Sequence, residues 1–246
     1  MVHSKNYRLR RVLGFLAILT GIGIWLVVNP DNYESQAAPS VPSETEGVPT
    51  ASAILEKLEV KGRAPKTGYA RTEFYNGWPN IDGCSLRQII IKREVGDTAK
   101  MDGCDVVAGS FTEPYTGANF VAKEKSDFSK NIQIDHIVAL SDAWQKGAQY
   151  MDKDTRYNIA TDPLNLIAAD SSANQQKSDG DAATWLPPNK SFRCQYVARQ
   201  VSVKYKYHLW VSEAEHDAIS NILSTCSDEP SVGISQLDDY SAASNE

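Results

Sequence analysis

The chain has 246 residues, of which 41% are hydrophobic, 23% charged and 9% aromatic. This composition is ordinary for a globular protein and excludes a wholly disordered, collagenous or polytopic membrane chain. The formal net charge of −6 arises in the flanks, because residues 29–59 and 227–246 are acidic while residues 60–226 hold equal numbers of acids and bases. The negative net charge is therefore only weak evidence against a nucleic-acid partner.

The N-terminal part has the pattern of an export segment. Residues 1–11 contain a basic cluster, and residues 12–28 contain no charge. The apolar stretch is long enough for a single transmembrane anchor, and it also fits the core of a long signal peptide. Basic residues stay in the cytoplasm, so residues 1–11 are expected there and everything after Val28 outside it, under both alternatives. Residues 29–52, rich in Pro, Ser, Glu and Ala, predict a disordered linker.

The first half of the folded region predicts short elements of mixed type. Residues 54–58 place leucine and isoleucine on one helical face, and residues 71–78 are aromatic and irregular. Residues 85–93 have apolar side chains at helical spacing, although their isoleucine run also fits a strand. Residues 104–111 and 118–122 predict two strands on either side of a Pro-Tyr-Thr-Gly turn.

The second half predicts more helix than strand. A third strand is expected over residues 132–134, followed by a helix over residues 139–148. A long helix is predicted over residues 191–209, with His208 on its apolar stripe as a core residue. A last helix begins with a capping box at Ser212 and runs to about residue 223. The sequence therefore predicts a mixed α+β fold with a helix-rich C-terminal half.

No second linker divides residues 53–226, so we expect one domain there, followed by an acidic disordered tail over residues 227–246. The four cysteines contain no Cys-x-x-Cys pair, which disfavours a zinc knuckle, and an oxidising exterior favours two disulfides. Four cysteines allow three pairings. The choice that is local in sequence is Cys84–Cys104 with Cys194–Cys226.

Four polar residues are hard to explain by packing alone. Asp135 and His136 follow an apolar strand, Asn165 lies within Asp-Pro-Leu-Asn-Leu, and Asn174 opens Asn-Gln-Gln-Lys. A carboxylate beside a histidine supplies an oxygen ligand for a divalent cation and a base that titrates near neutrality. An amide further along the chain can add a second oxygen ligand. Metal-assisted hydrolysis of phosphodiesters requires this combination.

Three segments in this order carry a family resemblance: IDHIVAL at residues 134–140, DPLNL at 162–166 and NQQKSD at 174–179. They resemble the His-Asn-His (HNH, ββα-metal) nucleases. More closely, residues 69–226 resemble exported HNH-family proteins that are related to the C-terminal nuclease domain of GmrSD-type restriction enzymes. The resemblance implies a single α+β domain with an embedded ββα-metal motif.

The resemblance also implies a role for each of the four residues. Asp135 and Asn174 would ligate the cation, His136 would be the general base, and Asn165 would hold the loop of the motif. The family often has histidine at the last position, and asparagine there favours a hard cation. We therefore expect Mg²⁺, with Mn²⁺ and Zn²⁺ as alternatives.

A basic stripe covers residues 190–206, where five lysines and arginines are interleaved with aromatic side chains and no acid occurs. Such a stripe can follow a phosphate backbone, and a solvated helix face explains it equally well. We expect Lys177, Arg199 and Lys204 to contact nucleic acid.

The sequence thus predicts a divalent-metal-dependent endonuclease that cleaves DNA, or RNA, outside the cytoplasm. The alternative is a non-catalytic protein that is anchored to the envelope and binds DNA or a cell-wall polymer on an HNH-like scaffold. The expected partners are a nucleic-acid substrate and, if residues 12–28 stay uncleaved, the membrane. No protein partner follows from the sequence.

Overall fold

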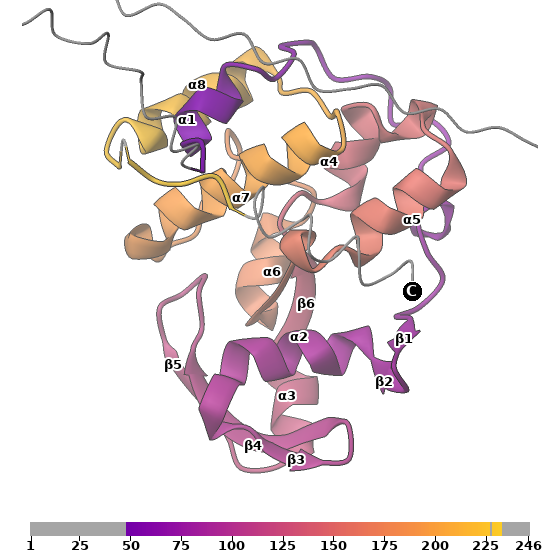
Figure 1. Cartoon of the computed structure of the whole chain (residues 1–246), viewed down its shortest axis with the longest axis vertical. Coiled ribbons are helices and arrows are strands. Elements are labelled where there is room, and N and C mark those ends of the chain that lie inside the picture. The colour runs from indigo at the N-terminus through magenta and orange to yellow at the C-terminus, as the bar shows by residue number, and fades with distance from the viewer. Residues whose placement is uncertain (1–47, 227, 233–246) are drawn as a thin grey trace, which may run out of the picture. The chain divides into compact units, whose positions relative to one another are not determined.

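A computed structural model describes residues 48–226 and 228–232 (Figure 1). The expected cytoplasmic segment, the apolar segment at residues 12–28, most of the linker and most of the tail lie outside the described residues. Within the described part, none of the helices combines the length and the apolar character needed to cross a membrane.

The helices lie mainly in the second half of the described chain, as the composition of that half predicts. The α-helices are α1 (Ala51–Leu55), α2 (Leu86–Val95), α3 (Lys125–Asn131), α4 (Leu140–Gln145), α5 (Lys153–Thr161), α6 (Ser171–Lys177), α7 (Arg193–Lys206) and α8 (Glu213–Leu223). Single turns of 3₁₀ helix are η2 (Arg71–Glu73), η3 (Gly96–Thr98), η4 (Ala148–Tyr150), η5 (Pro163–Asn165) and η6 (Lys190–Phe192).

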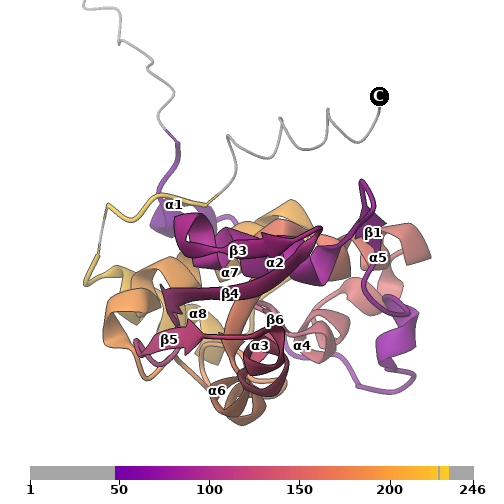
Figure 2. The same ribbon diagram turned by 90° about the horizontal axis from the view of Figure 1, so that it is seen from below.

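The strands form small antiparallel sheets. They are β1 (Asn80–Ile81), β2 (Cys84–Ser85), β3 (Lys100–Asp102), β4 (Asp105–Thr112), β5 (Asn119–Ala122), β6 (Ile132–His136) and β7 (Leu166–Asp170). Strand β1 pairs with β2, β4 lies between β3 and β5 and pairs with both, and β6 pairs with β7. Figure 2 shows α2 beside the β3–β4 hairpin, and α2 packs against β4. The α+β fold class is confirmed.

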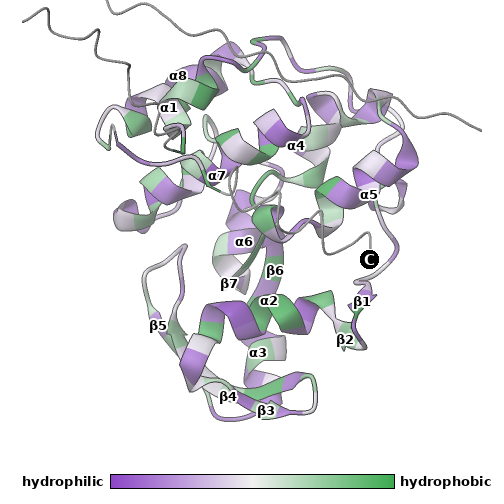
Figure 3. Cartoon of the chain, in the orientation of Figure 1, coloured by the Kyte–Doolittle hydropathy of each residue, from purple (hydrophilic) through white to green (hydrophobic). Residues whose placement is uncertain are grey.

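Most predicted elements are present. Residues 85–93 fitted both helix and strand, and the structure has helix α2 there, with Leu86, Ile90, Ile91 and Val95 buried. Figure 3 shows hydrophobic and hydrophilic residues alternating along this helix. The predicted N-cap of α8 is present, because the Ser212 side chain accepts a hydrogen bond from the backbone N–H of Glu215. The other half of the predicted capping box is not made, because the Glu215 carboxylate pairs with Lys146 and Lys204 instead. Helices α3 and α5 were not predicted. Each buries only one or two side chains, so the hydrophobic periodicity that reveals a helix is missing from both.

Strands β6 and β7 with helix α6 form a ββα unit. Asp135 pairs with Ile167 and His136 with Leu166 in the β6–β7 ladder. The two strands are neighbours in space but are joined by a long excursion that contains α4, η4, α5 and η5. Helix α6 follows β7 directly, with the Asp170 side chain as its N-cap. The embedded ββα motif is thus present, with a helical insertion in place of a tight connection.

Helix α7 lies at the centre of the helical part and contacts α1, α8 and η5. Every residue from 196 to 204 is buried. The sequence predicted a helix with one buried stripe, and the structure instead surrounds α7. His208 was expected in the core; it is exposed and adopts a φ of 49° in the turn after the helix.

A buried ion network joins α4, α7 and α8. It contains three cations and three carboxylates, listed here: Arg63, Lys146, Lys204, Asp142, Asp181 and Glu215. Lys146 and Lys204 are completely buried, at 0% exposure. Because burial of an unpaired charge is strongly unfavourable, the equal numbers of opposite charges are what allow this cluster to lie in the interior.

Two disulfides and a terminal clasp close the fold. The disulfides are Cys84–Cys104 and Cys194–Cys226, the pairing that is local in sequence. In the terminal clasp, which we define as residues 49–51 and 229–231, Thr50 pairs with Pro230 and backbone hydrogen bonds flank this bridge on both sides. The last residues of the predicted linker and the first of the predicted tail therefore take part in the folded structure.

Candidate active site

The C-terminal end of β6 presents Asp135 and His136, both nearly buried. The Asp135 carboxylate accepts hydrogen bonds from the Tyr115 hydroxyl at 2.5 Å and from the Lys177 ammonium at 2.9 and 3.2 Å. The Lys177 ammonium also donates to the backbone carbonyl of His136 at 2.8 Å. The carboxylate is therefore held in one orientation from two sides.

The His136 imidazole is fixed by aromatic contacts and by one hydrogen bond. Its ring stacks on Trp78, with centroids 5.8 Å apart, and contacts Tyr75 at an angle. Its Nε2 lies 2.9 Å from the backbone carbonyl of Ala160. A carbonyl oxygen only accepts, so Nε2 carries the proton and the lone pair of the neutral ring is on Nδ1.

The pKa of His136 is lowered to about 3, chiefly because the ring is buried. The hydrogen bond to Ala160 raises this pKa, and the positive charges of Arg71 and Lys177 lower it. The imidazole is therefore neutral at physiological pH. A neutral histidine with a defined tautomer is the form that can accept a proton from water.

Asn165 is fully buried and fastens the excursion to β6. Its side-chain oxygen accepts from the backbone N–H of Val138 at 2.8 Å, and its nitrogen donates to the carbonyls of Val138 and Ile159 at 3.3 and 3.0 Å. Asn165 therefore ties the residues just after β6 to helix α5, which supplies the Ala160 carbonyl, and its side-chain contacts are all with the backbone.

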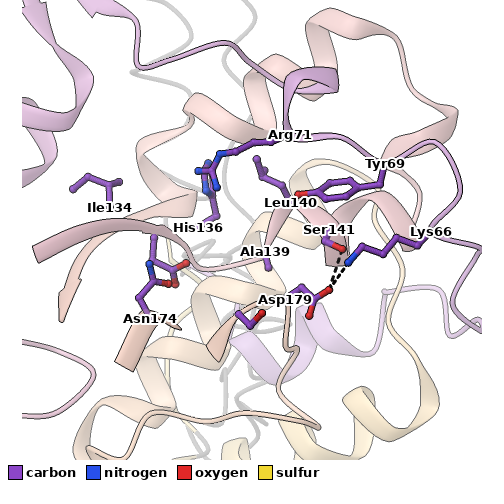
Figure 4. A pocket seen from close by; sticks show the side chains of 12 residues that line it. Lys66, Tyr69, Arg71, Ile134, His136, Ala139, Leu140, Ser141, Asn174 and Asp179 are labelled. Carbon is purple, nitrogen blue, oxygen red and sulfur yellow. Dashed lines mark hydrogen bonds and ion pairs between the residues drawn. The ribbon is translucent and has the colours of Figure 1, made fainter. Parts of the chain in front are cut away.

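A cleft of about 340 Å³ brings three of the four predicted residues together (Figure 4). Asp135, His136 and Asn174 all line it. Asn174, half-buried on α6, donates through its side-chain nitrogen to Gln133 at 2.8 Å. This contact leaves the amide oxygen of Asn174 as the atom that is suited to a cation.

The opposite wall of the cleft is formed by residues that the sequence did not predict at the site. Lys66, Tyr69 and Arg71 come from the segment before β1, and Ser141 and Asp179 complete this side. Arg71 is exposed, and its guanidinium donates to the Tyr75 hydroxyl. Only the aromatic composition of residues 71–78 pointed to this segment, because its approach to β6 depends on contacts between residues far apart in the chain.

The residues expected to contact nucleic acid are inside the protein, which corrects that expectation. Lys177, Arg199 and Lys204 are 1%, 8% and 0% exposed. Lys177 is bound to Asp135, Arg199 donates to backbone carbonyls of η5 and of the start of β7, and Lys204 belongs to the buried ion network. Within the basic stripe, Arg199 and Lys204 cannot contact a phosphate because other elements surround residues 196–204 of α7, whereas Lys190 and Lys206 are exposed. Neither of these two lysines lines the cleft, where Lys66 and Arg71 are the exposed cations.

The donor atoms of the cleft fit a hard divalent cation. Among the described residues, no three His, Cys, Asp or Glu side chains are grouped so that they could hold a metal ion. Asp135 and Asn174 would therefore be the protein ligands, through a carboxylate and an amide oxygen. Mg²⁺ is commonly bound by one or two protein oxygens, with waters and substrate phosphate completing its shell.

Comparisons with known proteins identify a family and a relative of this chain. Residues 104–222 match the family model described as GmrSD restriction endonucleases, C-terminal domain. An uncharacterized secreted protein of Arthroderma benhamiae is 34% identical over 216 residues, which cover 86% of this chain and 98% of that protein. No solved structure matches the chain. The chain therefore belongs to the family of GmrSD restriction endonuclease C-terminal domains.

Proposed function

We propose that the protein is a divalent-metal-dependent endonuclease that hydrolyses phosphodiester bonds of DNA, with RNA as the alternative substrate. The observation that carries this proposal is the meeting of Asp135, His136 and Asn174 in one cleft of a ββα unit. Membership in a family described by restriction endonucleases supports a nuclease-type activity.

In this proposal His136 is the general base. Its Nε2–H is held by the Ala160 carbonyl, so Nδ1 can take a proton from the attacking water. Oxygen then bonds to phosphorus as the bond to the leaving O3′ breaks, which leaves a 5′-phosphate. Burial keeps the imidazole neutral beforehand, and the stacked Trp78 restrains the ring.

Asp135 and Asn174 would hold the cation. When bound, Mg²⁺ would stabilise negative charge on the phosphate and on the leaving oxygen. Arg71 lies on the facing wall of the same cleft and is exposed, so its guanidinium can bind a phosphate oxygen. Lys177 keeps Asp135 oriented and partly neutralised before a cation binds.

We place this activity outside the cytoplasm. The relative from Arthroderma benhamiae is described as secreted, and the described part of this chain contains two disulfides. Disulfides persist in oxidising surroundings such as the extracellular space. Secretion of the mature protein and a single N-terminal anchor are both compatible with this location.

One contact favours the rival function, a protein that binds nucleic acid or a wall polymer without cleaving it. The Lys177 ammonium lies 2.9 Å from the carboxylate that would ligate the cation, so the ion pair competes with a metal for Asp135. If the Lys177 ammonium kept this position permanently, Asp135 could not ligate a cation, and the protein would bind its polymer without cleaving it.

Incubation of the purified protein with supercoiled plasmid and Mg²⁺, with and without EDTA, separates the two functions. The nuclease proposal expects cleavage that EDTA abolishes and that is lost in His136→Ala. Intact plasmid that is retained by the protein on a gel would instead support the binding scaffold. An unchanged rate in His136→Ala would show that the cleavage comes from another source.

A further inference from the structure

A second cleft of about 430 Å³ adjoins the first one. Its lining includes Arg63, Gln176, Thr184 and Trp185. Both clefts also share two lining residues, Lys66 and Asp179. The clefts are therefore contiguous, and these two side chains stand at the boundary between them.

Lys66 and Asp179 form an ion pair at this boundary (Figure 4). The ammonium lies 2.8 Å from the carboxylate, and both side chains are about half exposed, at 51% and 48%. The hydroxyl of Ser141 donates to the same carboxylate oxygen at 3.2 Å. Exposed ion pairs of this kind contribute little to stability, so another anion can replace the carboxylate on Lys66.

We propose that Lys66 binds a backbone phosphate of a nucleic-acid strand that runs from the first cleft into the second, and that Asp179 occupies this phosphate position in the free protein. The proposal rests on the nuclease function, and it adds a second phosphate-binding position beside the bond that is cleaved. Asp179 then limits the affinity for the strand, because the phosphate must displace it.

Among the cations that line the second cleft, the neighbouring charges favour Lys66. Arg63 lines the second cleft, but Asp142 and Asp181 of the buried ion network neutralise its guanidinium at 3.0 and 2.7 Å. Lys177 is also in that lining and is buried against Asp135. Lys66 instead has an exposed ammonium whose partner is exposed too.

Two features of the second cleft suit a nucleotide. Half-buried Trp185 offers an aromatic surface on which a base can stack, and Gln176 offers an amide for polar contacts. Lys66 precedes the family-matched residues 104–222, whereas Asp179 and Trp185 lie within them. Lys66, which lies before the matched residues, therefore supplies the positive charge that neutralises Asp179 at the boundary of the two clefts.

The experiment measures binding in EDTA, where cleavage is absent, by fluorescence anisotropy of a labelled single-stranded oligonucleotide. Each phosphate contact contributes about 0.7 to the slope of log affinity against log salt for single strands. Lys66→Ala should reduce that slope by about 0.7 and weaken binding by about eightfold at 50 mM salt and about fourfold at 150 mM. Asp179→Asn should tighten binding by up to about fivefold, the equivalent of one exposed ion pair.

A matched control exists on another surface. Lys125 and Asp105 form an exposed ion pair with comparable exposure, 52% and 40%, and neither lines the two clefts. Lys125→Ala and Asp105→Asn should leave the affinity and the salt slope as in the wild type. Melting curves of all variants establish that each is folded.

The outcomes distinguish this inference from the proposed function. Binding that depends on Lys66 and Asp179 in EDTA, without cleavage in Mg²⁺, would support the phosphate position and reject the nuclease. Cleavage in Mg²⁺ with a wild-type salt slope in Lys66→Ala would overturn the phosphate position alone. Weaker binding in Asp179→Asn, or no oligonucleotide binding by the wild type, would overturn it as well.

Discussion

Replacing Lys146 with methionine removes the cation that contacts three buried carboxylates. Its ammonium is 0% exposed and lies 2.8 Å from Asp142, 2.8 Å from Asp181 and 2.5 Å from Glu215. Methionine keeps most of the apolar stem, so the change tests the charge more than the packing. The buried ion network then carries three carboxylates against two cations.

The cations that remain in the network determine how much stability Lys146→Met should lose. Asp142 still contacts Lys204 and Arg63, while Asp181 keeps only Arg63 and Glu215 keeps only Lys204. Removing one partner of a buried ion pair lowers the free energy of unfolding by about 3–5 kcal/mol. Because no carboxylate loses every cation, we expect the lower end, about 3 kcal/mol.

Urea denaturation at pH 7 with the disulfides intact measures this loss. A domain of this size should also melt about 6–12 °C lower for a loss of about 3 kcal/mol. The comparison is Lys125→Met, which removes the exposed ion pair with Asp105 and should change stability by no more than about 1 kcal/mol. Equal stability of Lys146→Met and Lys125→Met would refute the reasoning that burial makes the charge of Lys146 indispensable.

The stability of Lys146→Met should also depend on pH less steeply than that of the wild type. Burial alone would raise the pKa of Asp142 and of Asp181, but the neighbouring cations hold both below their usual range. A depressed pKa contributes stability above the unfolded value near 3.9, and that stability is lost as pH falls through the folded value. The wild type should therefore lose stability steadily below about pH 4. Lys146→Met should show a shallower decline when urea midpoints are measured from pH 7 to pH 2.

Variants of the cleft separate base, ligand and scaffold. His136→Ala should lower the turnover of plasmid by about 10²–10⁴ while Mg²⁺ affinity, measured by calorimetry, stays near that of the wild type. Asp135→Asn should weaken Mg²⁺ binding, and high Mg²⁺ should restore part of the cleavage; loss of metal binding in His136→Ala as severe as in Asp135→Asn would reverse the two roles. Asn165→Ala leaves backbone groups of Val138 and Ile159 without their partner, so unfolding should become easier by about 1–3 kcal/mol in urea, with a smaller effect on Mg²⁺ affinity.

Local signals predicted the elements that bury an apolar face or begin with a cap. Helix α8 is the clearest case, because its Ser212 N-cap and its spacing agree with the structure. Helix α5 begins with the Asp152 side chain as N-cap, but only Ile159 and Ala160 are buried in it. With so little apolar surface, periodicity could not reveal the helix that supplies the carbonyl for His136.

Motif order located Asp135, His136 and Asn174, because the strand and helix that carry them are adjacent in the ββα unit. The environment of the basic residues could not be predicted in the same way. Lys204 is buried because carboxylates from α4 and α8 converge on α7, and such convergence leaves no local pattern. Lys66 and Arg71 likewise reach the cleft only because the chain folds residues that are far apart in sequence next to one another.

The terminal clasp makes the folded chain nearly a closed ring. Residues 49–51 and 229–231 are hydrogen-bonded neighbours, so a short peptide could join the two ends without moving any element. New ends could then be opened between Asp102, the exposed last residue of β3, and Gly103 in the turn that follows, where the Cys84–Cys104 disulfide keeps the cut strand attached. A chain permuted in this way would begin with the family-matched segment and end with the residues that supply Lys66 and Arg71. The cleft should therefore form whichever of its two walls comes first in the chain.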